Sequence, residues 1–212
     1  MSWLLTVDPG KNGCGCALWQ ERKFIVGNPY ALHGDRVEWS LVVAAYVAPP
    51  VGRDVEAIGR EALSTACEAT ARAVRDWHAN QIGTHCRKVK TAYDVEMRDL
   101  RLICELPRTY GGKAKKGDAN DNIVPLSVVG GMIAGALGCP TALVWPQDWK
   151  GSIPKPKKQS EPYVVQERCK EHLTPEEAAR VVWPRNKKLQ WDVADAIGIG
   201  LAHLGRAFKR IG

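Results

Sequence analysis

The chain has 212 residues and a formal net charge of +7, and 45% of its residues are hydrophobic. A chain of this length is most simply one globular domain with a sizeable core. No apolar run approaches the ~20 residues that cross a bilayer, and Met1 leads into an apolar strand without a signal-peptide pattern. The seven cysteines lack Cys-x-x-Cys spacing, so we expect reduced thiols in a cytoplasmic protein, without a disulfide framework or a zinc site.

The positive charge gathers in segments 113–116, 150–158 and 185–188, which lack helical or strand periodicity. A single cluster of this kind is typical of a solvated surface, but three clusters near acidic positions favour a nucleic-acid partner. The lysines that we expect to contact nucleic acid are Lys113, Lys115, Lys116, Lys150, Lys155 and Lys157.

The N-terminal region is predicted to form an antiparallel meander. The apolar run Trp3–Val7 indicates a strand buried on both faces, with Asp8 at its carboxyl end. Strands at Cys14–Trp19 and Lys23–Val26 follow, separated by a turn at 20–22.

The middle of the chain connects this meander to a further strand. Segment Val37–Val47 is compatible with either a strand or a short helix. Apolar residues at a 3.6-residue spacing predict an amphipathic helix over 55–77, and the polar segment 84–99 reads as a connection. The apolar run Leu100–Cys104 predicts the fourth strand, which ends on Glu105.

A strand, a helix and a second strand follow between residues 100 and 145, which indicates a right-handed parallel crossover. Asn122 is the expected helix cap, with Pro125 in the first turn, and Thr141–Trp145 is the expected fifth strand. The expected buried stripe of this helix is Leu126, Val129, Ile133 and Leu137.

The C-terminal region is predicted to be helical after a basic linker. We expect a helix over 163–172, and a capping box at Thr174 that opens a short helix running to about Val182. The last helix contains the sequence WDVADAIGIGLAHL. Together these elements predict an α/β fold with a five-stranded mixed sheet, an antiparallel meander followed by parallel strands, flanked by helices.

Four acidic residues are the strongest functional signal. Asp8 and Glu105 each end an apolar strand, where open α/β sheets place their ligands. Asp192 and Asp195 are three residues apart and therefore share one helix face. A favourable interaction with the helix dipole would also explain this pair. The apolar residues around it indicate a packed surface, however, where carboxylates need a partner such as a divalent cation.

The four acids lie in V-D-P-G, after the strand that Glu105 ends, and in W-D-V-A-D-A-I-G, with His203 further along the last helix. This pattern resembles the RuvC-type Holliday junction resolvases of the RNase H-like superfamily over most of the chain. The resemblance implies an RNase H-like fold in a single nuclease domain, 1–212, with an enlarged segment at about 28–99.

The resemblance also implies a chemistry. Asp8, Glu105, Asp192 and Asp195 would bind two Mg²⁺ ions, which Mn²⁺ could replace. Lys150 and Lys158 resemble the family's lysines near the scissile phosphate, with Lys158 as a catalytic residue, and Tyr110 is the nearest candidate for its junction wedge. The implied reaction is metal-dependent hydrolysis that resolves four-way DNA junctions by paired symmetric nicks. A homodimer would supply the two nicks. The helix 122–137 is a candidate dimer interface, unless its glycines pack against the sheet of the same chain.

Three other functions compete with this hypothesis. An RNase H-like nuclease could act on RNA–DNA hybrids or on other branched DNA. An actin-like sugar kinase or ATPase also places an acid after its first strand, but it would need a second phosphate-binding half. A DNA-binding relative without catalytic activity is disfavoured because all four acids are present.

Overall fold

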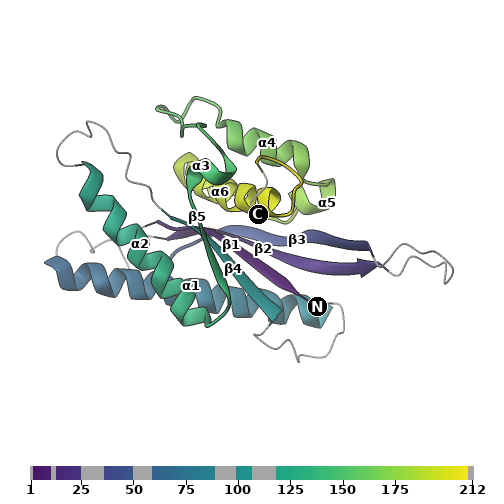
Figure 1. The fold of residues 1–212 in the computed structure, drawn as a ribbon, viewed down its shortest axis with the longest axis horizontal. Helices are drawn as coiled ribbons and strands as arrows, with labels where there is room; N and C mark the ends of the chain where they lie inside the picture. Colours follow the sequence, from purple (N-terminus) through teal and green to yellow (C-terminus); the bar gives the residue numbers. More distant parts are fainter. Residues whose placement is uncertain are drawn as a thin grey trace.

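The computed structural model describes residues 2–10, 13–24, 36–49, 59–88, 99–106 and 118–209. Its centre is a six-stranded sheet in the order β5-β4-β1-β2-β3-β6 (Figure 1). The strands are β1 (Trp3–Asp8), β2 (Cys14–Phe24), β3 (Arg36–Val47), β4 (Leu100–Glu105), β5 (Thr141–Val144) and β6 (Val181–Val182). The helices are α1 (Gly59–Lys88), α2 (Asp118–Leu137), α3 (Pro146–Trp149), α4 (Val164–His172), α5 (Pro175–Ala178) and α6 (Lys187–His203). None of these described helices is long and apolar enough to cross a membrane.

The predicted mixed α/β fold is confirmed. β2 pairs antiparallel with both β1 and β3, whereas β4 pairs parallel with β1 and β5 pairs parallel with β4. The sheet has six strands instead of five, because two predicted strands form the single strand β2 while β3 and β6 are added. β6 pairs parallel with residues 44–45 of β3. The predicted helix from Thr174 to Val182 is therefore wrong in its second half, since α5 ends at Ala178.

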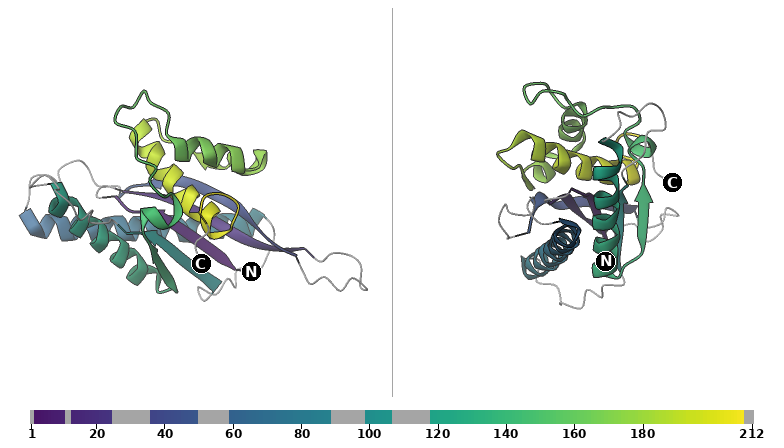
Figure 2. Two further views of the ribbon diagram at one scale, coloured as in Figure 1. Left: turned by 45° about the horizontal axis from the view of Figure 1, so that its top comes forward. Right: turned by 90° about the vertical axis from the view of Figure 1, so that its left-hand side faces the viewer.

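Helices cover both faces of the sheet, α1 and α2 on one face and α3 to α6 on the other (Figures 1 and 2). Side chains alternate along β1, so Leu4 packs in the core beneath α6, while Leu5 and Val7 pack in the core on the side of α1 and α2. All six residues of β1 are buried. The prediction of a strand buried on both faces is confirmed.

The predicted turn at 20–22 is wrong, and residues 23–24 of the strand predicted at 23–26 belong to β2; residues 25–26 lie outside the described residues. β2 continues through Gln20 to Phe24, and its pairing with β3 runs without interruption from Trp19↔Leu41 to Phe24↔Arg36. Backbone amides in an antiparallel pair are satisfied by the neighbouring strand whatever the polarity of the side chains, so a polar run does not require a turn. The third strand is β3, which settles the segment 37–47 as strand.

Both helices on the first face are longer than predicted. α1 continues past residue 77 to Lys88, into part of the segment predicted as a connection. α2 begins at Asp118, so Asn122 is not its cap, and Pro125 lies inside the helix. Tertiary packing can maintain a helix across a residue that removes one backbone hydrogen bond.

The predicted stripe of α2 is largely buried. Val129, Ile133 and Leu137 pack beneath the helix, while Leu126 is half-buried. A Cβ atom at Gly130 would lie 3.2 Å from the Sγ atom of Cys104, so this glycine packs against the sheet of its own chain.

Two C-terminal features, α4 and the capping box at Thr174, match the prediction. α4 occupies the predicted range 163–172 except for its first residue, which is the helix cap. Thr174 Oγ1 accepts a hydrogen bond from Glu177 N, and Glu177 Oε2 accepts one from Thr174 N, so the capping box is present. The linker after β5 contains one short helix that the sequence did not predict, α3.

Candidate active site

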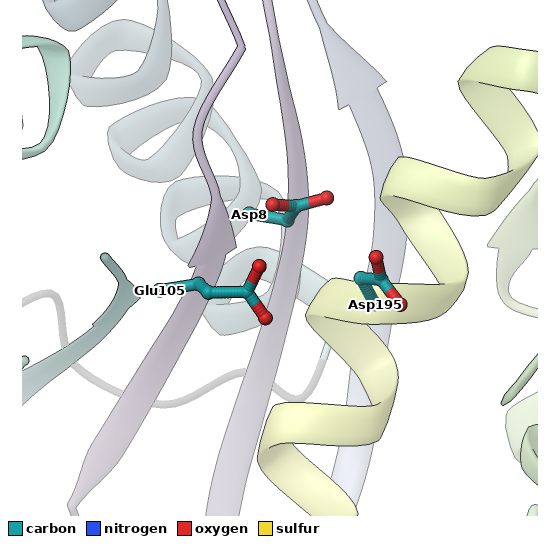
Figure 3. Close-up of side chains that lie close together, drawn as sticks. All are labelled: Asp8, Glu105 and Asp195. Carbon is teal, nitrogen blue, oxygen red and sulfur yellow. The ribbon is translucent and has the colours of Figure 1, made fainter. Parts of the chain in front are cut away.

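The ends of β1 and β4 bring the first two acids together. The two strands are parallel neighbours, and Val7 of β1 pairs with Cys104 of β4, one residue before each acid. Asp8 and Glu105 therefore reach the same edge of the sheet. Figure 3 shows their side chains pointing toward each other and toward Asp195 of α6. One carboxylate oxygen from each of these three residues lies within 4.8 Å of the other two.

Glycine in β2 brings α6 close enough to complete this cluster. Gly15 pairs with Asp8 across the sheet. A Cβ atom at Gly15 would lie 1.9 Å from the carbonyl oxygen of Asp192, so only glycine lets the helix backbone lie directly on the strand there. α6 begins at Lys187, which places Asp192 and Asp195 beyond its first turn. The helix-dipole explanation of this pair is therefore wrong.

Two lysines of the segment after β5 enter the cluster. Lys150 Nζ lies 2.9 Å from Asp195 Oδ2 and 3.5 Å from Glu105 Oε2. Lys155 Nζ lies 2.8 Å from Asp192 Oδ1, and 3.2 Å from both Asp8 Oδ2 and Asp195 Oδ2. The structure therefore brings all four predicted acids together around two ammonium groups.

Two aromatic side chains, which the sequence interpretation missed, also bind the carboxylates. Trp149 Nε1 donates a hydrogen bond of 2.8 Å to Glu105 Oε2, and Tyr163 OH donates one of 2.5 Å to Asp195 Oδ1. Both aromatic residues are almost fully buried. Each donor fixes the orientation of one carboxylate, as outer groups around metal ligands commonly do. An aromatic residue with a polar atom at each end of the basic linker was the available sequence signal.

Trp149 is itself held by the last helix and the C-terminal segment. A Cβ atom at Gly198 of α6 would lie 2.5 Å from its ring, so glycine makes room for the indole. The ring of Phe208 packs edge-on against it at 5.4 Å between centroids, and Lys209 N donates to its carbonyl oxygen. The indole N–H is thus aimed at Glu105 by rigid packing.

Burial and mutual repulsion disfavour the ionised form of the acids in this cluster. Burial and the neighbouring carboxylates raise the pKa of Asp8 well above its ordinary value, against the opposing effect of Lys155. Burial likewise raises the pKa of Glu105 and of Asp192. Burial alone would lower the pKa of Lys150 and Lys155, but the carboxylates around them raise both above the ordinary value. The lysines therefore stay charged. An additional cation bound between the acids would stabilise their ionised form.

The net charge and the ligand atoms of the cluster together indicate which kind of cation would fit it. Four ionised carboxylates carry −4 and the two ammonium groups +2, so the ionised cluster keeps a net charge of −2. Carboxylate oxygens are the ligands that Mg²⁺, Ca²⁺ and Mn²⁺ prefer. The donor set of Asp8, Glu105 and Asp195, buried and drawn from three elements, therefore fits a hard divalent cation.

The other predicted residues lie elsewhere. Lys157 and Lys158 are exposed. Within the described part of the chain, the Lys158 amine forms no ion pair with the four acids, a place that Lys150 and Lys155 take instead. The loop residues Tyr110, Lys113, Lys115 and Lys116 fall outside the described residues.

Two solved structures are similar to this chain. The structure of T. thermophilus RuvC in complex with a Holliday junction substrate is 14% identical, and the match covers 98% of this chain and 99% of that chain with a TM-score of 0.44. A second Thermus thermophilus RuvC structure is 13% identical over 97% of this chain and 98% of that chain, with a TM-score of 0.41. No family model and no curated protein match the chain. Both structures are of the family that the sequence motifs resemble.

Proposed function

We propose that this protein is a metal-dependent endodeoxyribonuclease that resolves four-way DNA junctions by paired nicks. The observation that supports this proposal is the cluster of Asp8, Glu105 and Asp195, whose ligand oxygens lie within 4.8 Å of one another. Buried carboxylates at this separation are suited to holding the cations that drive phosphodiester hydrolysis.

The acidic residues of the cluster are proposed to bind the metal ions. Asp8, Glu105 and Asp195 would hold Mg²⁺, with Asp192 beside them, and the sequence resemblance implies two such ions, which Mn²⁺ could replace. When bound, these ions stabilise the negative charge on the attacking and leaving oxygens of the phosphodiester.

Fixed protein groups complete the site. Trp149 and Tyr163 keep the carboxylates of Glu105 and Asp195 in one orientation. The Lys150 ammonium is buried between these two acids, so it is positioned to offset negative charge without reorganisation. Lys158, on the same segment, is proposed to approach the scissile phosphate when DNA is bound.

DNA binding is assigned to the basic segments 113–116 and 155–158, together with Tyr110. Lys150, which the sequence also led us to expect as a DNA contact, is instead buried between Glu105 and Asp195. Lysine contacts to phosphates would position the duplex arms without reading their sequence. All seven cysteines are free thiols, as a reducing cytoplasm would keep them, so we place the protein there.

A homodimer is proposed because a four-way junction is close to two-fold symmetric and its resolution needs two nicks. An isologous dimer presents two sites in matching geometry. α2 is the proposed interface: Val128, Gly131 and Gly135 are exposed on it. We propose that residues 1–212 form one nuclease domain around the single sheet, with 28–99 as its enlarged part.

The test is cleavage of three substrates by the full chain in Mg²⁺: a four-way junction, an RNA–DNA hybrid duplex and a DNA duplex of the same sequence. We expect cuts at symmetric positions on two opposed strands of the junction, loss of cleavage with EDTA, and little cutting of either duplex. Preferred cutting of the hybrid would instead identify an RNase H. Absence of cleavage of all three would contradict a nuclease.

A further inference from the structure

The ammonium of Lys155 lies among three aspartates and uses one oxygen of each. Its Nζ atom is 3.2 Å from Asp8 Oδ2, 2.8 Å from Asp192 Oδ1 and 3.2 Å from Asp195 Oδ2. The ammonium donates hydrogen bonds to Asp8 and Asp192, and its third close contact, with Asp195, is an ion pair. A single positive charge thus lies where three carboxylates from β1 and α6 converge.

The cluster therefore contains two places for a cation. One lies between Asp8, Glu105 and Asp195, whose ligand oxygens approach one another within 4.8 Å. The other is the place among Asp8, Asp192 and Asp195 that the Lys155 ammonium holds. Asp8 and Asp195 belong to both, as shared ligands of two neighbouring cations would.

The two lysines of the cluster differ in how firmly they are held. The Lys150 side chain is 7% exposed and the Lys155 side chain is 41% exposed. Lys150 also follows Trp149, which is packed against α6, whereas Lys155 lies between Pro154 and Pro156 in a segment without helix or strand. Lys155 can therefore leave the cluster without unpacking the core, and Lys150 cannot.

We propose that Lys155 occupies the second cation position of the DNA-free protein, so that the free chain binds one divalent ion and accepts a second only when this ammonium leaves. The inference rests on the proposed metal-dependent nuclease. When the Lys155 ammonium leaves the cluster, three carboxylates lose this partner and the ammonium loses its anions. Replacement of this ammonium by a divalent ion is therefore favoured when a phosphodiester is present at the same time. The phosphodiester gives the ammonium a new anionic partner. Lys155 would thereby link occupancy of the second position to the presence of DNA.

The test counts Mn²⁺ ions bound by the full chain without DNA, by calorimetric titration and by the electron paramagnetic resonance signal of free Mn²⁺. We expect one ion per chain in the wild type and two in Lys155→Met. Lys158→Met is the matched control: it removes an exposed lysine of the same segment that makes no ion pair with the four acids, so one ion is expected. In the double variant Lys155→Met with Asp192→Asn, the second ion should be lost again.

Each other outcome contradicts the inference in its own way. Two ions in the wild type, or one ion in folded Lys155→Met, would overturn the role of Lys155 and leave the proposed metal centre intact. No ion in either protein would overturn the metal centre itself. Circular dichroism checks that Lys155→Met is folded, and Lys155→Gln, which keeps a polar side chain, replaces it if it is not.

Discussion

The two faces of the sheet differ in whether their buried polar groups have partners. On the face beneath α6, the described buried acids are all paired: Asp8, Glu105 and Asp195 with lysines, and Glu177 with Arg206. On the face beneath α1 and α2, the core consists of apolar side chains and cysteines. There, His78 and Thr70 of α1 are buried without a hydrogen-bond partner among the described residues.

Strand β1 contributes side chains to both faces, because successive side chains of a strand point to opposite sides. Asp8 points to the α6 face, whereas Leu5 and Val7 point to the other. We infer that one face carries the chemistry and the other supplies stability without entering the site. Substitutions a few residues apart on this strand should therefore have separate effects.

The largest expected effect is on the α6 face. Asp8→Asn or Glu105→Gln should abolish junction cleavage, a loss of at least about 10³-fold, because each variant removes a proposed ligand and its charge. Junction binding should be largely retained, since the basic segments are unchanged. Cleavage rates at saturating DNA and a gel-shift titration measure the two properties. Full activity of either variant in Mg²⁺ would remove that residue from the site.

The opposite face should show the reverse behaviour. Leu5→Ala deletes a fully buried side chain and should lower the free energy of unfolding by about 2–5 kcal/mol. Cleavage per folded molecule, measured well below the unfolding temperature, should stay within about twofold of the wild type. Urea unfolding gives the stability. A large loss of activity in fully folded Leu5→Ala would show that the two faces are not independent.

A smaller effect is expected for the groups that orient the acids. Tyr163→Phe keeps the ring but removes the hydroxyl that donates to Asp195 Oδ1. The affinity for Mn²⁺ should fall by about 10- to 100-fold, as is usual when an outer partner of a metal ligand is lost. Calorimetric titration of the DNA-free protein measures it. An unchanged affinity would mean that the packing of α6 alone fixes this carboxylate.

The smallest expected effect concerns His78 and the dependence of stability on pH. Burial lowers the pKa of His78 from 6.5 to about 4. The unfolded chain therefore binds a proton at this residue between those pH values while the folded protein does not, so stability falls as the pH drops through this window. At pH 5 the loss from this residue is about 2 kcal/mol.

His78→Leu isolates this contribution. The variant should lose less stability between pH 7 and pH 5 than the wild type, as urea unfolding at the two pH values would show. Equal losses in the two proteins would mean that the His78 imidazole is protonated in the folded state at pH 5.

The sequence predicted the fold where one side-chain pattern dominates. The apolar runs before Asp8 and Glu105 match β1 and β4, because a continuous apolar run is typical of a strand buried on both faces. The helix expected over 163–172 matches α4. The continuation of β2 through Gln20 could not be predicted in this way, because the polar stretch that follows Trp19 lacks an apolar strand pattern and is paired with β3. The start of α2 at Asp118 was missed because Asn122 and Pro125 are a typical N-terminal signal.

The candidate site was predictable to a similar extent. The spacing of the four acids indicated that they meet, and the structure brings them together. The choice of lysines was less accessible, since the basic segment after β5 offers several and only tertiary packing selects Lys150 and Lys155. The aromatic donors Trp149 and Tyr163 were missed because their position at the two ends of the basic linker does not by itself separate a hydrogen-bond donor from an ordinary core aromatic residue.

The central claim is that Asp8, Glu105 and Asp195 hold a divalent cation on the α6 face. It is tested most directly by crystals of the DNA-free protein soaked in Mn²⁺, with diffraction data collected at a wavelength where manganese scatters anomalously. We expect an anomalous peak between these three carboxylates, about 2.0–2.3 Å from one oxygen of each, in the range usual for oxygen ligands of small divalent ions. A map without a peak there, from crystals in saturating Mn²⁺, would contradict the assignment of this cluster as a metal centre.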